Sequence, residues 1–343
     1  MPRRPVLFAL LGLFAAVVVA SPLTFGIAGV PGAAPPDAAT ESGDAINQVY
    51  WVVYALAAAV FIVVELTLIV FVFRFARRRQ ERVGDVEGPQ IHGNTRLEVI
   101  WTAIPALLLL GLAIYTFSRI PDVEAKPSPG EDALVVNVTA HQFYWQYEYP
   151  NGALSFDTLY LPVNRKVQLM LRSADVNHSW WVPELTGKRD SIPGVTNELN
   201  FRPRRTGTFA NGVCGEFCGI QHARMTTRVS VLETSGFNAW LRQNDPAGGD
   251  DDAELALGEA EWAAACAKCH GLEGEGDIGP QVAQNPTLTD FEALRTLLYE
   301  GRNDEGTEGY MPPVGKGWSE EQIRALIAYV ESNSALGGEQ DGR

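Results

Sequence analysis

The chain has 343 residues, of which 46% are hydrophobic, and this length suits two or three domains of ordinary size. Its formal net charge is −14, and no run of Lys and Arg alternates with aromatic residues, so a nucleic-acid-binding surface is disfavoured. The four cysteines form two close pairs in separate regions, Cys214 with Cys218 and Cys266 with Cys269. Because disulfide frameworks usually spread their cysteines over longer loops, close pairs indicate metal or cofactor chemistry.

Three apolar segments near the N-terminus predict contact with a membrane. Residues 1–20 begin with basic residues, continue through an apolar run and end in V-x-A, which is typical of a signal peptide; a third membrane anchor is the alternative. The segments at about 49–75 and 99–119 each approach or exceed the ~20 apolar residues that span a bilayer. We expect them to form a transmembrane hairpin within residues 45–120.

The loop between the two expected spans is rich in arginine and is therefore expected in the cytoplasm. Whether or not the N-terminal segment is cleaved, the chain after Ile120 then lies outside, so the protein is expected in the cell membrane with its C-terminal domains on the extracytoplasmic side. Glu65 lies inside the first span, where a carboxylate is either functional or a neutral packing residue. The arginines of the loop are Arg74, Arg77, Arg78, Arg79, Arg82 and Arg96.

Short strand-like segments occupy residues 121–242. Segments such as ALVVNVTA and KVQLMLRS are rich in β-branched residues, alternate partly between apolar and polar positions, and are separated by turns that contain Pro, Gly or Asn. This pattern predicts a β-sandwich. The sequence CGEFCGIQHARM (214–225) lies between the last two expected strands.

The loop at 214–225 contains two cysteines, a histidine and a methionine. Gly215 and Gly219 each cost a helix about 1 kcal/mol relative to Ala, so we predict a loop folded around metal instead of a helix. Two thiolates, an imidazole and a thioether suit copper better than magnesium or calcium, and the thioether favours copper over zinc. A zinc site completed by His178 and a pair of buried cysteines without a ligand are the alternatives.

Several stretches together resemble subunit II of the haem–copper cytochrome c oxidases. They are RLEVIWTAIP (96–105), HQFYWQYEY (141–149), NHSWWVPE (177–184) and the loop at 214–225, and the similarity covers about residues 45–235. The resemblance implies a cupredoxin-like domain whose loop cysteines bridge two coppers, the CuA centre. Its implied ligands are Cys214 and Cys218 as bridging thiolates, His178 and His222 as terminal imidazoles, Met225 as a weak axial ligand, and the backbone carbonyl of Glu216.

Two coppers that share two thiolates can spread one electron over both metals, so bond lengths change little on reduction, and a fixed loop keeps this geometry rigid. Quinol-oxidising relatives lack these ligands, so the resemblance implies cytochrome c chemistry. It also implies that the Glu216 side chain binds a magnesium ion shared with subunit I. Glu98 falls where the family has a carboxylate at the cytoplasmic mouth of a proton pathway, with an ordinary interfacial glutamate as the alternative.

The aromatic stretch at 141–149 departs from the family at one position. Phe143 stands where many members have the tryptophan through which electrons enter from soluble cytochrome c, whereas Tyr144 and Trp145 match the family. We interpret these three residues as an electron path whose outer end is adapted to a permanent partner. His141 is expected to be structural.

A polar linker at 243–253 precedes a helical segment at 254–337. The segment contains Cys266-Ala-Lys-Cys269-His270, the spacing that attaches a c-type haem through two thioethers and sets a histidine on the iron. Met311, the only later methionine, is the expected second axial ligand, with a core-filling role as the alternative. A thioredoxin-like redox pair would share the Cys spacing but not the histidine, and no βαβ pattern accompanies it.

The same segment resembles the class I cytochromes c, which implies that the carbonyl of Pro280 accepts the second N–H of the axial histidine. Two sequences that are typical of capping boxes, Thr289-x-x-Glu292 and Ser319-x-x-Gln322, predict the starts of two helices. The fold class is therefore a multidomain membrane protein with a two-helix transmembrane hairpin, a cupredoxin-like β-sandwich and an all-α cytochrome c domain.

These observations predict subunit II of a respiratory cytochrome c oxidase with a fused cytochrome c domain. Electrons would pass from the covalent haem c to the CuA centre and on to haem a in subunit I, where oxygen is reduced to water and protons are pumped; no catalytic residue is expected in this chain. Expected partners are subunit I with its haem a and copper, subunit III, and a cytochrome c or a quinol:cytochrome c reductase as donor. The alternatives are a membrane-anchored carrier for another terminal reductase and a protein for copper assembly or storage.

Overall fold

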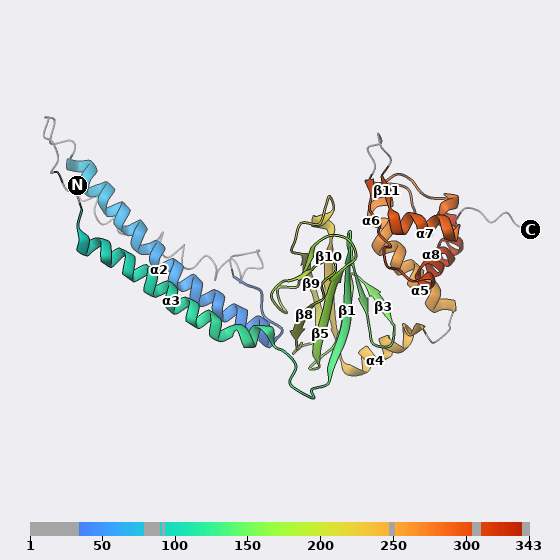
Figure 1. Ribbon diagram of the computed structural model, residues 1–343, viewed down its shortest axis with the longest axis horizontal. Coiled ribbons are helices and arrows are strands. Elements are labelled where there is room, and N and C mark those ends of the chain that lie inside the picture. Colours follow the sequence, from blue (N-terminus) through green and yellow to red (C-terminus); the bar gives the residue numbers. More distant parts are fainter. Residues whose placement is uncertain (1–33, 79–89, 91–92, 247–250, 304–309, 338–343) are drawn as a thin grey trace, which may run out of the picture. The chain divides into compact units, whose positions relative to one another are not determined.

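The computed structural model describes residues 34–78, 90, 93–246, 251–303 and 310–337 (Figure 1). Its contacts divide the chain into two units, one holding Asp44–Val123 and the other holding Ala38–Gly43 together with the chain from Glu124 onward. The expected signal peptide and the middle of the arginine-rich loop lie outside the described residues.

Among the described residues, two helices are long and apolar enough to cross a membrane, α2 (Glu41–Arg78) and α3 (Thr95–Glu124), and they run side by side (Figure 1). Large apolar side chains cover their outer surfaces, and α3 buries none of its residues. Such a surface fits lipid, because a helix satisfies its own backbone hydrogen bonds and leaves apolar side chains for the bilayer. Both helices are longer than the expected spans, since polar residues extend each of them at the ends.

Within the described part of the chain, ten strands form a sandwich of two five-stranded sheets, with orders β3-β2-β1-β5-β8 and β4-β10-β9-β6-β7. The strands are β1 (Ala133–His141), β2 (Tyr144–Glu148), β3 (Leu154–Phe156), β4 (Thr158–Pro162), β5 (Lys166–Ser173), β6 (His178–Trp181), β7 (Arg189–Ser191), β8 (Asn197–Phe201), β9 (Gly207–Cys214) and β10 (Thr226–Leu232).

Alternation of apolar residues builds the sandwich, as the sequence predicted. In β1, Leu134, Val136 and Val138 are buried, and the strand pairs in parallel with β5. The core also contains a group of paired polar atoms: the Tyr147 hydroxyl accepts from Trp180 Nε1 at 2.9 Å and shares a 2.6 Å hydrogen bond with Thr227 Oγ1. Burial of these groups is therefore compatible with a stable core.

A helix that the sequence analysis did not predict, α4 (Thr234–Gln243), follows β10 directly. It buries Phe237 and stacks Trp240 on Tyr160, with ring centroids 4.5 Å apart. The helix therefore belongs to the sandwich core, and it begins at the residue after Glu233.

The C-terminal region is helical, as predicted. Its elements are α5 (Asp251–Glu261), a π-helical turn (Trp262–Cys266), α6 (Ala267–His270), a 3₁₀ turn (Pro286–Leu288), α7 (Phe291–Glu300), β11 (Arg302–Asn303), β12 (Tyr310–Met311), α8 (Glu320–Ser332) and α9 (Ser334–Gly337). The first helix begins two residues before the end of the expected linker.

One of the two predicted capping boxes is present and the other is wrong. At α8, the Ser319 hydroxyl accepts from the Gln322 amide at 3.2 Å, and the Gln322 side chain accepts from the Ser319 amide at 3.1 Å. At α7, the cap is Asp290, whose carboxylate accepts from the Ala293 amide at 2.9 Å. Thr289 instead ends the preceding 3₁₀ turn, so the carboxylate one residue later takes the capping position.

Candidate metal centre and haem site

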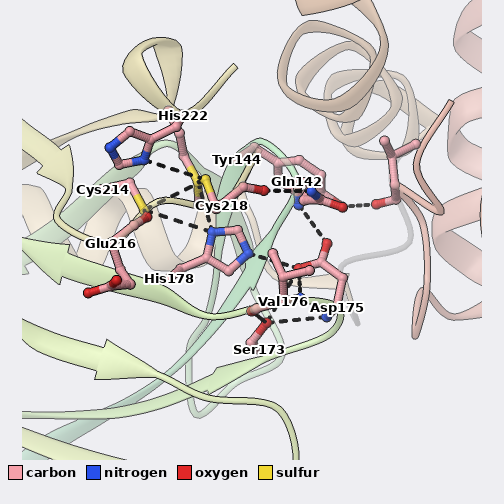
Figure 2. Close-up of polar contacts among 12 residues, drawn as sticks. Gln142, Tyr144, Ser173, Asp175, Val176, His178, Cys214, Glu216, Cys218 and His222 are labelled. Atoms are coloured by element: carbon pink, nitrogen blue, oxygen red, sulfur yellow. Dashed lines mark hydrogen bonds and ion pairs between the residues drawn. The ribbon is translucent and has the colours of Figure 1, made fainter. Parts of the chain in front are cut away.

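The loop between β9 and β10 and the first residue of β6 form one cluster of metal-binding side chains (Figure 2). β6 pairs with β9 so that Trp180 lies opposite Cys214, which brings His178 to the base of the loop. Backbone hydrogen bonds close the loop: the Gly215 amide donates to the Ser179 carbonyl at 2.7 Å, and the Cys214 amide donates to the Met225 carbonyl at 3.0 Å.

The two sulfurs lie between two imidazole rings (Figure 2). Cys214 Sγ and Cys218 Sγ are 3.9 Å apart. Nδ1 of His178 is 3.9 Å from Cys214 Sγ, and Nδ1 of His222 is 3.7 Å from Cys218 Sγ. Each ring thus presents the same nitrogen to its own cysteine, which gives a nitrogen–sulfur–sulfur–nitrogen arrangement.

The two weaker expected ligands adjoin the same sulfurs. Met225 Sδ lies 3.8 Å from Cys218 Sγ and 3.1 Å from His178 Nδ1. The carbonyl oxygen of Glu216 is 3.2 Å from Cys214 Sγ. All the side chains and the carbonyl that the sequence pointed to are therefore brought together, and the soft donors fit copper.

Asp175, which the sequence analysis missed, orients one of the rings. Its Oδ1 lies 2.8 Å from Nε2 of His178, and the carboxylate also accepts from the amides of Gln142 at 2.7 Å and Val176 at 2.6 Å. The carboxylate assigns the ring proton to Nε2 and leaves the Nδ1 lone pair directed at the sulfurs. Its position three residues before the histidine was the available signal.

Charge on this pair is set by burial and hydrogen bonding. Burial alone would raise the pKa of Asp175 and lower that of His178. Burial is the largest single influence on each group, but the hydrogen bonds and charges around it together outweigh burial: the pKa of Asp175 is lowered by His178 and two backbone amides, and that of His178 is raised by Asp175 and Cys214. The pair therefore holds a strong, oriented contact beneath the cysteines.

Contact between the two cysteines shifts their pKa values in opposite directions. A hydrogen bond from Cys218 lowers the pKa of Cys214 below that of a free thiol, and the same contact together with burial raises the pKa of Cys218. The contact therefore favours ionisation of Cys214 over ionisation of Cys218. A metal that bridges both sulfurs would displace the remaining proton, since the thiolate is the form that binds metal.

The haem-attachment motif ends α6, and the following loop holds its histidine. His270 Nδ1 lies 2.7 Å from the Pro280 carbonyl oxygen, the contact that the resemblance implied. Gly279 approaches the ring so closely that an added Cβ would lie 2.8 Å from His270 Cε1. The ring is thus fixed through Nδ1, and Nε2 remains for an iron ligand bond, so the residues fit a haem.

The other cytochrome-site residues lie on the same core. Cys266 is buried, and burial raises its pKa to about 12, while the pKa of the half-buried Cys269 is also raised by burial. Met311, on β12, packs against this core. Its axial role stays a prediction.

The aromatic residues of the expected electron path are all buried. Phe143 is 6% exposed, and Tyr144 and Trp145 are fully buried. His141 is also buried and stacks on Tyr144, with ring centroids 4.7 Å apart. An exposed docking patch at these residues is therefore not what the structure presents.

The carboxylates of Glu216, the expected magnesium ligand, and Glu98, at the expected entry of a proton pathway, are not part of the cluster around the two cysteines. The Glu216 side chain is half-exposed and lies 3.5 Å from Lys188 Nζ. In the same loop Phe217 and Ile220 are 76% and 83% exposed, an apolar pair that the sequence analysis overlooked. Glu98 lies in the first turn of α3, where its carboxylate accepts from the Asn94 amide at 3.2 Å.

Three protein families match successive parts of the chain. They are described as Cytochrome C oxidase subunit II, transmembrane domain (residues 31–118), Cytochrome C oxidase subunit II, periplasmic domain (residues 157–232), and Cytochrome C oxidase, cbb3-type, subunit III (residues 253–330). The first two families imply a membrane-anchored protein with an extracytoplasmic sandwich, and the second and third imply copper and haem c.

Named relatives agree with these families. Cytochrome c oxidase subunit 2 of Alkalihalophilus pseudofirmus is 33% identical over 307 residues, covering 83% of this chain and 88% of the relative. Cytochrome c oxidase subunit 2 of Bacillus subtilis is 31% identical over 259 residues, covering 71% of this chain and 73% of the relative. The crystal structure of the periplasmic domain of subunit II from Bradyrhizobium japonicum is 31% identical, covers 34% of this chain and 95% of that domain, and has a TM-score of 0.32. The chain therefore belongs to the subunit II family of the cytochrome c oxidases, oxidoreductases of the haem–copper class, and carries a cytochrome c domain at its C-terminal end.

Proposed function

We propose that this chain receives electrons at a haem c bound to Cys266 and Cys269 and delivers them, through a CuA centre, to haem a of subunit I. The observation that carries the proposal is the convergence of His178, Cys214, Cys218 and His222, with one imidazole at each sulfur. Each transfer moves one electron, so the donor is oxidised as the acceptor is reduced, and no proton or bond moves with it. Oxygen reduction and proton pumping are assigned to subunit I.

The chain's own residues would fix and shield the copper ions. His178 and Met225 are fully buried, and Cys214 and Cys218 are nearly so. When bound, a copper pair accepts one electron that is shared between both metals. Because the ligands are held by backbone hydrogen bonds at both ends of the loop and by Asp175, they need little rearrangement when that charge changes.

The haem would be held by residues of the cytochrome domain. Cys266 and Cys269 would form the thioethers, His270 would bind the iron through Nε2, and Met311 would provide the second axial ligand. The 2.7 Å contact between His270 Nδ1 and the Pro280 carbonyl supports this arrangement, because it fixes the ring orientation.

The tip of the copper loop would face subunit I. Phe217 and Ile220 expose apolar side chains beside Glu216, and exposed apolar groups of this kind mark interaction surfaces. Glu216 would then provide the carboxylate for a magnesium ion at that boundary, and Glu98 would stand at the cytoplasmic mouth of a proton pathway. We further propose subunit III as a partner and a cytochrome c or a quinol:cytochrome c reductase as donor.

Metal analysis and electron paramagnetic resonance of the purified full chain test the proposal. We expect copper and iron in a ratio of two to one, with a copper signal from one electron shared by two nuclei. Cys218→Ser should leave the haem in place and convert the copper signal to that of a single ion. Zinc in place of copper would contradict the proposal. Purification with a haem-containing protein of many membrane spans would support an oxidase, and purification with another reductase would support a carrier.

A further inference from the structure

Tyr144, at the start of β2 in the sandwich, has its side chain in the core of the cytochrome domain. It is fully buried in one cluster with Val314 and Trp318. Its hydroxyl donates to the Val314 carbonyl oxygen at 2.6 Å and accepts from Trp318 Nε1 at 2.8 Å. The two aromatic rings meet edge to face with centroids 6.4 Å apart. One hydroxyl thus satisfies a buried donor and a buried acceptor of the other domain.

A second contact comes from inside the haem-attachment motif. Lys268 Nζ donates to the Phe143 carbonyl oxygen at 2.9 Å and forms an ion pair with Asp157. The side chains of this pair are 21% and 26% exposed, and the Asp157 carboxylate also accepts from the Trp145 amide at 2.9 Å. Because the pair is mostly shielded from water and hydrogen-bonded on both sides, removing or reversing one charge would leave the other in a poorly hydrated place without its partner.

A third contact joins the two cofactor-binding segments directly. Gln221 immediately precedes His222 in the copper loop and is 3% exposed. Its Nε2 lies 2.7 Å from Sγ of Cys269. In the haem-loaded protein this sulfur would be a thioether, which remains a weak acceptor for an amide N–H. One side chain therefore spans the distance between a haem anchor and the backbone of a copper ligand.

We propose that the cytochrome domain docks on the sandwich through a dedicated surface, the Tyr144–Lys268–Gln221 interface, which holds the haem-attachment motif against the copper loop. The role of this interface in electron transfer rests on the proposed function, whereas the contacts themselves do not. The occupant of the surface is the segment 254–337 of this same chain. Flexible tethering alone would not produce a buried tyrosine, a shielded ion pair and a buried amide bridge at one contact.

The interface also accounts for Phe143. Its carbonyl accepts from Lys268 and its ring lies under Gly219, where an added Cβ would be 3.0 Å from Phe143 Cε1. The position at which the sequence analysis placed the outer end of an electron path is therefore covered by the copper loop and by the chain's own cytochrome domain.

Charge reversal at Lys268 tests the docking in the intact oxidase complex. Lys268→Glu places a carboxylate beside Asp157 and the Phe143 carbonyl, so the domains should separate. We expect hydrogen exchange of the backbone amides at 143–145 and 314–318 to become at least tenfold faster, and transfer from haem to copper after flash reduction to become at least tenfold slower, with haem and copper spectra unchanged. Asp157→Asn in the same chain should partly restore both, because it removes the repulsion.

The matched control is Asp277→Asn. It removes an ion pair with Arg224 that also joins the two domains, but both side chains are more than half exposed and the pair contributes little, so both rates should change by less than twofold. Gln221→Leu should slow electron transfer several-fold while the amides at 143–145 and 314–318 stay protected from exchange. This result would separate the role of the Gln221–Cys269 contact in electron transfer from its role in holding the domains together. Unchanged exchange and transfer in Lys268→Glu would overturn the proposal. Absence of copper from the wild-type chain would instead contradict the proposed function, and hydrogen exchange would still report on docking.

Discussion

Asp175 and His178 form a 2.8 Å contact that turns the imidazole so that Nδ1 faces the cysteine sulfurs. Asp175→Asn should weaken copper binding by roughly 10- to 100-fold, because the ring loses the carboxylate that fixes its proton and orientation. Competition with a copper chelator measures this affinity. Asp132→Asn is the control, since that carboxylate is 84% exposed beside Arg165. Equal copper affinity in the wild-type chain and Asp175→Asn would rule out this role.

Glu261 predicts a pH-dependent stability of the cytochrome domain. It is fully buried, its Oε1 accepts from Gln322 Nε2 at 3.1 Å, and burial raises its pKa well above 4.5. Above pH 4.5 the unfolded carboxyl loses its proton while the folded carboxyl keeps it. The free energy of unfolding therefore decreases as pH rises from 4.5 to the raised pKa of the folded state.

Glu261→Gln should match the wild-type stability near pH 4.5 and exceed it increasingly at higher pH, because the amide cannot ionise. Denaturant unfolding followed by the haem absorption band gives this difference. Glu292→Gln, at a position 77% exposed on α7, should leave the pH dependence unaltered. Parallel pH profiles for the wild-type chain and Glu261→Gln would refute the explanation.

Gly258 marks a close crossing of α5 and α8. A Cβ at this position would lie 2.0 Å from the Ala325 carbonyl oxygen. Gly258→Ala should destabilise the cytochrome domain, because overpacking of about 1–3 kcal/mol or more exceeds the helix-propensity gain of about 1 kcal/mol. Gly236→Ala in α4 is the matched change, since its nearest atom is 3.8 Å away, and it should stabilise the fold slightly. Thermal unfolding measures the stability of both variants. A Gly258→Ala variant that is more stable than the wild-type chain would contradict the close approach of α5 and α8 at this glycine.

Gly279 allows the loop after the haem motif to lie against His270. Gly279→Ala should lower the haem content per chain, because the new Cβ would collide with the ring and pull Nδ1 from the Pro280 carbonyl. Pro280→Ala keeps that carbonyl and should bind haem nearly as well. Haem is quantified by absorption against total protein, and full haem content in Gly279→Ala would show that the close approach is unimportant.

The residues of the candidate metal centre could be grouped from the sequence because most of them share one short loop, and thiol, imidazole and thioether groups have few other reasons to occur together. The sandwich followed from alternation in segments such as β1 and β5. Asp175 was overlooked because a carboxylate three residues before a histidine is common, and only the fold shows that it contacts the ring. The cap of α7 was misplaced by one residue because Thr289 and Asp290 are both acceptable caps and the preceding 3₁₀ turn decides between them.

The sequence suggested a permanent partner near Phe143, but it could not show which residues of the two C-terminal domains meet. Tyr144 and Trp318 are 174 positions apart, and their pairing depends on two separately folded surfaces. Local patterns assign each residue to its own domain, so Tyr144 was expected on a path within the sandwich. The apolar pair Phe217 and Ile220 was missed for a related reason, since exposure is a property of the folded loop.

The burial of Tyr144 has a kinetic consequence. A diffusing electron carrier must leave its acceptor after each delivery, so its contact has to be small, hydrated and short-lived. A tyrosine hydroxyl buried between a carbonyl and an indole favours long residence instead, because separation would leave both partners without a hydrogen bond until water enters. In the proposed electron route, the only contact that would have to form and break in each turnover is then the one between the cytochrome domain and its own donor.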